Sequence, residues 1–505
     1  MHKISNYLIL PGLILFLNLE PIIAQNISSE KQFVLDWLSQ PKAVEKFGKI
    51  SDAIWSYAEL GLQEFKSSKL LADNLEKAGF RVERGLAGMP TCFVATYGSG
   101  KPVIGFTGEF DALPMISQKA MTPRQEPLVN GAPGHGCGHN TMCTAASAAA
   151  IAVKEAMDKY GIKGTIKVFG SPAEEMLVSR PYMIRAGLFE GVDAIIDNHA
   201  ATEFTTEYGL WCSALYSVIF TFKGRTAHSA YPSAGRSALD AVEIMNVSTN
   251  FLREHLDFMS RMHYVIIEGG QGPNVVPDRA SVWYYIRNDD NKVEDMYRRV
   301  VLCAKGAAMA TETTIDTIRV LTAIHQAHLS KACAELIHKN VKLVGMPEWT
   351  EEEQQFAKAL QKELGRNQNG LKTEIDPIIE PEIVFTGGAS TDLGEVTLLA
   401  PTACVSTPTI VPGTTGHHWS TVTCLKGSIA WKGLNAGAKV IAATAVDLLT
   451  KPEELKKLRD EFEAYSKKHP YKSFLPEGAT PPLDLNMELM NKYRPLMEPN
   501  YSKPF

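Results

Sequence analysis

The sequence predicts an α/β protein with a mostly parallel-sheet catalytic domain and an inserted βαββαβ domain of ferredoxin-like type. At 505 residues the chain exceeds the length at which one hydrophobic core stops growing, so two globular units are expected. Apolar residues make up 45% and charged residues 21%, which is typical of a globular protein. Short β-rich runs alternate with helical patterns on both sides of a segment that follows a different order.

The first part of the catalytic domain is expected within residues 30–212. Strand patterns occur at residues 103–110, 165–169 and 193–198, and a helical pattern occupies residues 144–160. Strands that alternate with a helix of this length indicate βαβ units and a parallel sheet.

The inserted domain is expected within residues 213–325. Its patterns follow the order strand, helix, strand, strand, helix and strand, at residues 216–223, 237–256, 263–269, 279–288, 293–310 and 313–320. This order is the split βαβ motif, which forms a compact unit by itself.

The second part of the catalytic domain is expected within residues 326–450. It contains a helix at 335–344, strands at 383–385 and 402–407, and a long helix at 427–449. The catalytic sheet would then be interrupted in sequence by the inserted domain. Residues 451–505 form a charged, proline-rich tail.

The N-terminus has the pattern of a secretory signal peptide at residues 1–24. Lys3 precedes an apolar run, and the small residue Ala24 lies before a polar stretch. Asn18 and Glu20 interrupt the run before it reaches the roughly 20 residues that a membrane anchor needs. We therefore expect a periplasmic or secreted protein that is not held by a membrane after processing.

The charge and the cysteine content argue against two classes, nucleic-acid-binding proteins and disulfide-stabilised scaffolds. The formal net charge of −5, without long basic runs, gives no reason to expect nucleic acid as a partner and favours a small molecule. The eight cysteines have no framework spacing, so a disulfide scaffold is not indicated.

The sequence GHGCGHN at residues 134–140 is the first candidate for chemistry. Cys137 and His139 stand two residues apart on a glycine-rich turn, so a thiolate and an imidazole can face one cation. A plain glycine turn would explain an isolated pair of this kind at least as well.

Further metal donors follow predicted strands. Glu174 and Glu175 end one strand and His199 ends the next, where open α/β sheets place their ligands. Adjacent carboxylates repel each other unless a cation or a shared proton intervenes. With His417 and His418 from a later turn, these clusters supply enough donors for two first-row ions.

Six segments occur along the chain in a characteristic order. They are FTGEFDALP at 106–114, GCGHN at 136–140, PAEE at 172–175, NH at 198–199, AHSA at 227–230 and GPNVVPD at 272–278. In this order they resemble the dinuclear metallopeptidase and amidohydrolase family of aminoacylase, carboxypeptidase G and the indole-acetyl-amino-acid hydrolases, and the resemblance covers roughly residues 35 to 450. Residues 390–392 and 412–421 are similar in particular to the aminobenzoyl-glutamate utilization protein B type.

The resemblance implies two divalent metal ions, Mn²⁺ or Zn²⁺, with Glu174 as general base. The implied ligands are Cys137, His139, Glu175, His199 and His417, with His418 as the alternative to the last. Asp111 and Asp392 would orient ligands, or would be turn-capping acids. The chain departs from the commonest peptidase branch, because Glu109 stands where that branch has a ligand histidine and the Cys137 turn replaces its bridging aspartate.

The resemblance also assigns residues of the inserted domain. His228 would stabilise the oxyanion, often across a dimer interface, while Asn274 and Arg287 would hold the substrate backbone and its carboxylate. A homodimer, or a pair with a paralogous partner chain, is expected.

The expected activity is hydrolysis of an amide bond by a metal-activated water. The substrate would be a small N-acyl-amino acid, an aminobenzoyl-glutamate-like compound or a dipeptide. Two alternatives are a metal-bearing binding protein without catalysis and a hydrolase with Cys137 as nucleophile. Retention of Glu174 favours catalysis, since a structural metal site needs no spare base.

Overall fold

The computed structural model describes residues 27–381 and 388–504. The predicted signal peptide at 1–24 and the predicted strand at 383–385 lie outside these ranges. Among the described residues, no helix combines the length and the hydropathy needed to cross a membrane.

The larger part of the molecule is built on a sheet that has seven strands in the described ranges, in the order β1-β2-β4-β3-β5-β13-β6. The inner strands β4, β3, β5 and β13 are parallel, whereas β1, β2 and β6 pair antiparallel at the edges. The strands are β1 Arg81–Arg84, β2 Phe93–Ser99, β3 Val103–Glu109, β4 Gly164–Ser171, β5 Ala194–Ala201, β6 Thr205–Thr206 and β13 Thr402–Pro408. This arrangement confirms the predicted mostly parallel α/β fold.

The inner strands of this sheet are buried on both faces, which explains why they carry apolar side chains on both faces. Successive residues of one strand belong to different cores: Ile196 packs in the core under α4 and α12, and Ile195 packs in the core beside α5 and α10. In β4, Val168 likewise packs in the first of these cores and Phe169 in the second.

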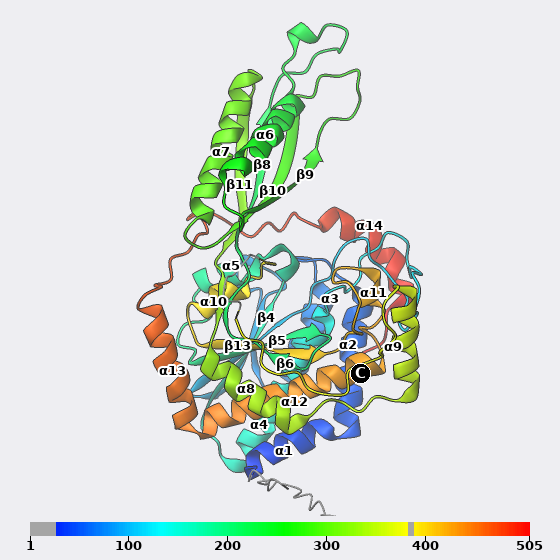
Figure 1. Ribbon diagram of the computed structural model, residues 1–505, viewed down its shortest axis with the longest axis vertical. Helices are drawn as coiled ribbons and strands as arrows, with labels where there is room; N and C mark the ends of the chain where they lie inside the picture. Colours follow the sequence, from blue (N-terminus) through cyan, green and yellow to red (C-terminus); the bar gives the residue numbers. More distant parts are fainter. Residues whose placement is uncertain (1–26, 382–387, 505) are drawn as a thin grey trace, which may run out of the picture.

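Helices cover the two faces and the ends of this sheet (Figure 1). They are α1 Ser29–Ser39, α2 Pro41–Tyr57, α3 Phe65–Lys77, α4 His139–Tyr160, α5 Ser179–Arg185, α8 Lys331–Val344, α9 Glu351–Glu363, α10 Leu393–Thr397, α11 Trp419–Val422 and α12 Ser428–Thr450. A short ladder of β7 Gly209–Trp211 and β12 Ala327–Leu329 lies near the point where the chain leaves for the inserted domain and returns.

The inserted domain projects from the sheet-bearing part (Figure 1). Its antiparallel sheet has the order β11-β8-β10-β9, and two helices pack on it. The elements are β8 Ala214–Lys223, α6 Ala238–Leu252, β9 Arg261–Glu268, β10 Arg279–Asn288, α7 Val293–Ala310 and β11 Thr314–Ile324, which is the predicted βαββαβ order.

The C-terminal segment contacts both parts of the molecule. After α13 Pro452–Ser466 the chain runs past the base of the inserted domain to α14 Met487–Met497 (Figure 1). Phe474 stacks on His325 with ring centroids 3.8 Å apart, and Asp484 pairs with Arg319 of β11. No pattern in the sequence indicates these contacts.

Candidate metal centre and active site

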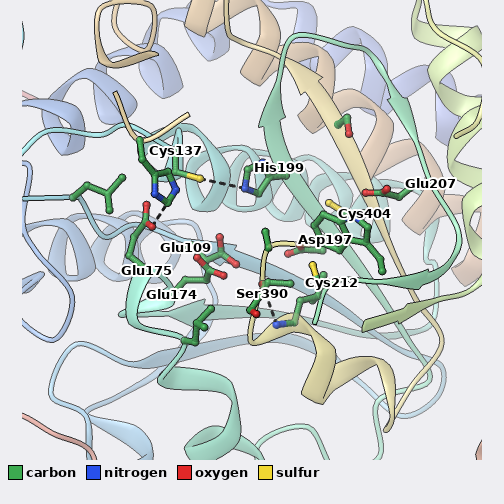
Figure 2. A pocket seen from close by; sticks show the side chains of 18 of the residues that line it. Glu109, Cys137, Glu174, Glu175, Asp197, His199, Glu207, Cys212, Ser390 and Cys404 are labelled. Atoms are coloured by element: carbon green, nitrogen blue, oxygen red, sulfur yellow. Dashed lines mark hydrogen bonds and ion pairs between the residues drawn. The ribbon is translucent and has the colours of Figure 1, made fainter. Parts of the chain in front are cut away.

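The candidate donors gather around one cavity at the carboxyl ends of the parallel strands (Figure 2). Cys137 and His139 stand at the start of α4, Glu174 and Glu175 follow β4, and His199 lies in β5. The cavity has a volume of about 430 Å³, which is ordinary for a small-molecule site.

Glycines allow the Cys137 turn to approach its neighbours. Gly138 has φ +94°, and a Cβ atom there would lie 2.2 Å from the side chain of Ala200 on β5. A Cβ atom on Gly136 would lie 2.5 Å from Ile116 and 3.2 Å from the backbone of His417. A larger residue at either position would push the turn away from the other donors.

Three groups of candidate donor atoms lie close together in the described part of the chain, and two of them share one sulfur. The first group is Cys137, His139 and His199, and the second is Cys137, Glu175 and His417. The third, which lacks the sulfur, is Glu109, His139 and Glu174, and the ligand atoms lie within 4.8 Å of one another in each group. Cys137 Sγ lies 3.4 Å from His199 Nε2, and His417 Nε2 lies 3.4 Å from Glu175 Oε2. A thiolate in this place can bridge two cations.

Asp111 fixes one member of each group. Its Oδ1 lies 2.8 Å from His139 Nδ1, so that Nε2 faces the centre, and its Oδ2 accepts the backbone N–H of Glu175 at 3.0 Å. Carboxylates that orient a ligand imidazole in this way are common around metal sites.

The turn that carries the two glutamates has a strained backbone. Ala173 and Leu177, on either side of the Glu174–Met176 helical turn, have φ values of +54° and +59°. Glu64, fully buried, accepts the backbone N–H of Ala173 at 2.8 Å and holds the turn in place. Such conformations persist only where the surroundings impose them, and they are frequent at functional sites.

Thiol and imidazole ionise together in this centre. Burial alone would raise the pKa of Cys137, but the neighbouring His199 and His139 lower that pKa well below its usual value. Burial would lower the pKa of His199, but the Cys137 thiolate raises it to about 10. A cation bound between these side chains would replace the imidazole protons as the counter-charge.

The two adjacent glutamates carry a surplus of negative charge. Burial and then Glu109 raise the pKa of Glu174 well above its usual value, and burial and then Cys137 do the same for Glu175. Two carboxylates that are costly to ionise side by side are suited to share cations or a mobile proton.

A buried arginine that no sequence pattern indicates lies under the centre. Arg180 has no exposed surface and its guanidinium lies 2.6 Å from Glu109 Oε1. Asp392 pairs with the same guanidinium and accepts the backbone N–H of Arg180, so it acts on Arg180 and not directly on a metal donor. Asp197 lies 3.7 Å away on the other side.

The two C-terminal histidines have different surroundings. His417 is held by a backbone hydrogen bond to Gly136 O at 3.0 Å and faces the centre. His418 caps α11, with Nδ1 2.9 Å from Ser420 Oγ. The geometry therefore favours His417 as the donor.

The structure separates the three candidate residues of the inserted domain. Arg287, near the end of β10, lines the cavity and donates from Nε to Ser390 Oγ at 3.0 Å. His228 and Asn274 are exposed on adjoining loops at the far end of β10, where His228 forms an isolated bridge with Val275. Within one chain these two residues do not line the cavity.

The side chains of the centre are suited to bind divalent metal ions. Within the described part of the chain, His139 Nε2 and Glu175 Oε1 are buried without a hydrogen-bond partner. Buried polar atoms are rarely left unpaired, and sulfur, imidazole and carboxylate together suit a first-row ion.

The chain is similar in sequence to a family of dimerisation domains and to hydrolases of small amides and peptides. Residues 214–301 match a family described as a peptidase dimerisation domain. The chain is 37% identical over 465 residues to one of the subunits of p-aminobenzoyl-glutamate hydrolase from Escherichia coli, covering 86% of this chain and 96% of that protein. It is 28% identical to the mouse (Mus musculus) Xaa-Arg dipeptidase, covering 84% and 90% of the two chains.

The fold is also similar to solved structures. One is a Bacillus subtilis protein described as a dinuclear metal-binding peptidase of the M20 family, with a TM-score of 0.52 at 17% identity. The match covers 82% of this chain and 100% of that one.

Replacing Arg180 with methionine should lower the free energy of unfolding by about 3–5 kcal/mol, because Glu109 and Asp392 would be left buried without their cation. Urea denaturation of the two proteins measures the difference. Arg298→Met, which breaks an exposed pair with Asp295, is the matched control and should cost no more than about 1 kcal/mol. Equal losses in both variants would contradict the role given to Arg180.

Proposed function

The chain belongs to the M20 peptidase family of dinuclear metal-dependent hydrolases, and we propose that it cleaves an amide bond with Glu174 as general base. Its substrates are small, as are those named for its relatives. The substrate proposed here is an N-acyl-amino acid or a dipeptide with a free carboxylate. The observation that carries the proposal is the pair of donor groups that share Cys137 beside Glu174.

Two divalent ions are proposed to occupy the two donor groups. His139 and His199 would hold one ion, Glu175 and His417 the other, and the Cys137 thiolate would contact both. Mn²⁺ and Zn²⁺ are the proposed identities: the thiolate favours the softer Zn²⁺, and the carboxylate also accepts Mn²⁺. When bound, such ions lower the pKa of a shared water and polarise the scissile carbonyl.

Glu174 is placed to move the proton in this reaction. Its carboxylate lines the cavity, and Oε2 lies 3.8 Å from His139 Nε2 without hydrogen-bonding to it. Its raised pKa suits a group that accepts a proton from the attacking water and then donates it to the departing nitrogen. No covalent intermediate is needed.

Arg287 is proposed to bind the carboxylate next to the scissile amide. It is the one lysine or arginine among the described residues that line the cavity. Its guanidinium lies 5.1 Å from the ring of Tyr285, and Ser390 engages only Nε, so the terminal nitrogens are free for a bidentate contact.

A hydrolase with Cys137 as nucleophile is the second candidate. The 3.4 Å approach of Cys137 Sγ to His199 Nε2, together with the lowered pKa of the thiol, resembles an activated thiol and base. This alternative gives no role to Glu175 and His417, whereas the metal centre uses both.

The active site is proposed to be completed by a second chain. His228 and Asn274 lie far from their own cavity but in the segment that matches the dimerisation domain. In a dimer formed through that domain, the partner's copies can reach the cavity and donate to the oxyanion. The Escherichia coli relative is named as a subunit, so a paralogous partner is a second arrangement to consider.

Export is proposed from residues 1–24 alone. Removal of this segment after Ala24 would leave Gln25 as the first residue of a periplasmic or secreted protein, which N-terminal sequencing of the exported form would identify.

Glu174→Gln should keep most of the bound metal and lower kcat at least about a hundredfold, because the positioned base is lost while the donors stay. Metal content per chain and turnover are measured on the same sample. Full activity in this variant would place the base elsewhere.

Cys137→Ala should lower metal occupancy and activity together, since both donor groups lose the shared sulfur. Elemental analysis after dialysis gives the occupancy. In the wild-type protein, chelation should abolish activity and added Mn²⁺ or Zn²⁺ should restore it. Activity that survives complete metal removal would instead favour the thiol nucleophile.

Mixing inactive His228→Ala with inactive Glu174→Gln should restore activity once protomers exchange. Each mixed dimer would contain one site with an intact Glu174 and an intact His228 from the partner. Native mass spectrometry verifies the exchange, and an assay before and after gives the recovery. If mixed dimers form and stay inactive, His228 does not serve the neighbouring site.

A further inference from the structure

One acidic side chain in the cavity has no role in the hydrolysis proposed above. Among the described residues, five carboxylates line the cavity: Glu109, Glu174, Glu175, Asp197 and Glu207. Arg180 pairs with Glu109 and approaches Asp197, and the adjacent glutamates belong to the metal centre. Among the described residues, none pairs with Glu207.

Glu207 lies at the end of the cavity away from the metal donors. It follows β6, and Figure 2 shows its carboxylate pointing back into the cavity, past Cys404 and on the opposite side from Cys137. A backbone bridge to Ile379 fixes the position of its main chain. The carboxylate is therefore presented to whatever occupies the cavity.

Within the described ranges, no neighbouring side chain compensates the charge of Glu207. Its carboxylate makes no hydrogen bond or ion pair with any residue in 27–381 or 388–504, and residues 382–387 include no lysine, arginine or histidine. Burial raises its pKa, and His199 opposes this in part. A half-buried, unpaired carboxylate is costly, and a cationic ligand group would remove that cost.

Glu207 and Arg287 place opposite charges on one stretch of the cavity. Glu207, Cys212 and Arg287 all line this cavity. Burial, then Glu207 and Glu174, raise the pKa of the Cys212 thiol, and Arg287 lowers it, so Cys212 lies within reach of all three charges. Cys212 and Trp211 form the wall there and are largely apolar. The arrangement suits a ligand with a carboxylate, a short apolar stem and a cation.

We infer that Glu207 selects substrates whose leaving amino acid carries a cationic side chain, such as lysine or arginine. The inference rests on the proposed function, in which Arg287 holds the α-carboxylate of the leaving residue. With that carboxylate on Arg287, the side chain of the same residue extends along Trp211 and Cys212, and its ammonium or guanidinium group meets Glu207. A glutamate leaving group would instead bring a second carboxylate against Glu207.

Binding of the free amino acids to the metal-loaded enzyme tests this selection without turnover. By isothermal titration calorimetry, L-arginine and L-lysine should bind at least about tenfold more tightly than L-glutamate. Glu207→Gln, which keeps the shape of the side chain, should remove most of that preference. Glu203→Gln is the matched control: this residue lies four positions earlier, pairs with Lys372 and does not line the cavity, so the preference should be unchanged.

A preference for L-glutamate in the wild-type protein, or an equal preference for arginine in wild type and Glu207→Gln, would overturn the inference. Glu207→Lys is a second variant and should favour L-glutamate.

Turnover separates this inference from the proposed function. Hippuryl-lysine, hippuryl-arginine and hippuryl-glutamate share one acyl group, so their kcat/KM ratios report the leaving residue. Wild type should prefer the basic compounds at least about tenfold, and Glu207→Gln should not. Hydrolysis of all three at equal rates would overturn the selection but leave the amidohydrolase activity intact. No hydrolysis of any, with the binding preference retained, would reject the proposed reaction and keep the cationic subsite.

Discussion

An excess of buried negative charge at the carboxyl edge of the parallel strands is the constraint on which the rest of the structure depends. Glu174, Glu175 and the Cys137 thiol converge there, and burial penalises the ionised form of each. The fully buried Arg180 offsets Glu109 and Asp392 beneath them. We propose that cations within the two donor groups that share Cys137 offset the remaining charge, and that the Cys137 sulfur would contact both of them.

The two parts of the molecule contribute different components to this site. The sheet-bearing part holds the donors rigidly, through Asp111, Glu64 and the strained turn after β4. The inserted domain contributes Arg287 at the near end of β10 and exposes His228 on a loop at the far end. Under the proposal that two chains complete each site, β10 would serve its own cavity through Arg287 and a neighbour's through the loops that precede it. The C-terminal segment contacts both parts, the inserted domain through Asp484 and the sheet-bearing part through Arg494.

The sequence predicted the fold and the donor clusters because both depend on local patterns. Strand ends followed by Glu174–Glu175 or His199, and glycines around Cys137, are visible along the chain. Arg180 is not visible in this way, since a serine–arginine–proline sequence is typical of a surface turn and only the tertiary structure buries it. The sequence leaves Asp392 either to orient a metal ligand or to cap a turn, because it does not show that Arg180 lies beside this carboxylate. The edge strand β1 is short and mostly polar, and its neighbour β2 ends in polar residues and glycine, so the sequence pattern does not show these two antiparallel strands.

The central claim is a dinuclear centre bridged by Cys137, and anomalous X-ray diffraction from crystals loaded with Zn²⁺ or Mn²⁺ tests it most directly. Data collected at the absorption edge should show two peaks per chain. One should lie among Cys137, His139 and His199, and the other among Cys137, Glu175 and His417, with the sulfur in contact with both. A single peak, or two peaks of which neither contacts Cys137, would contradict the claim.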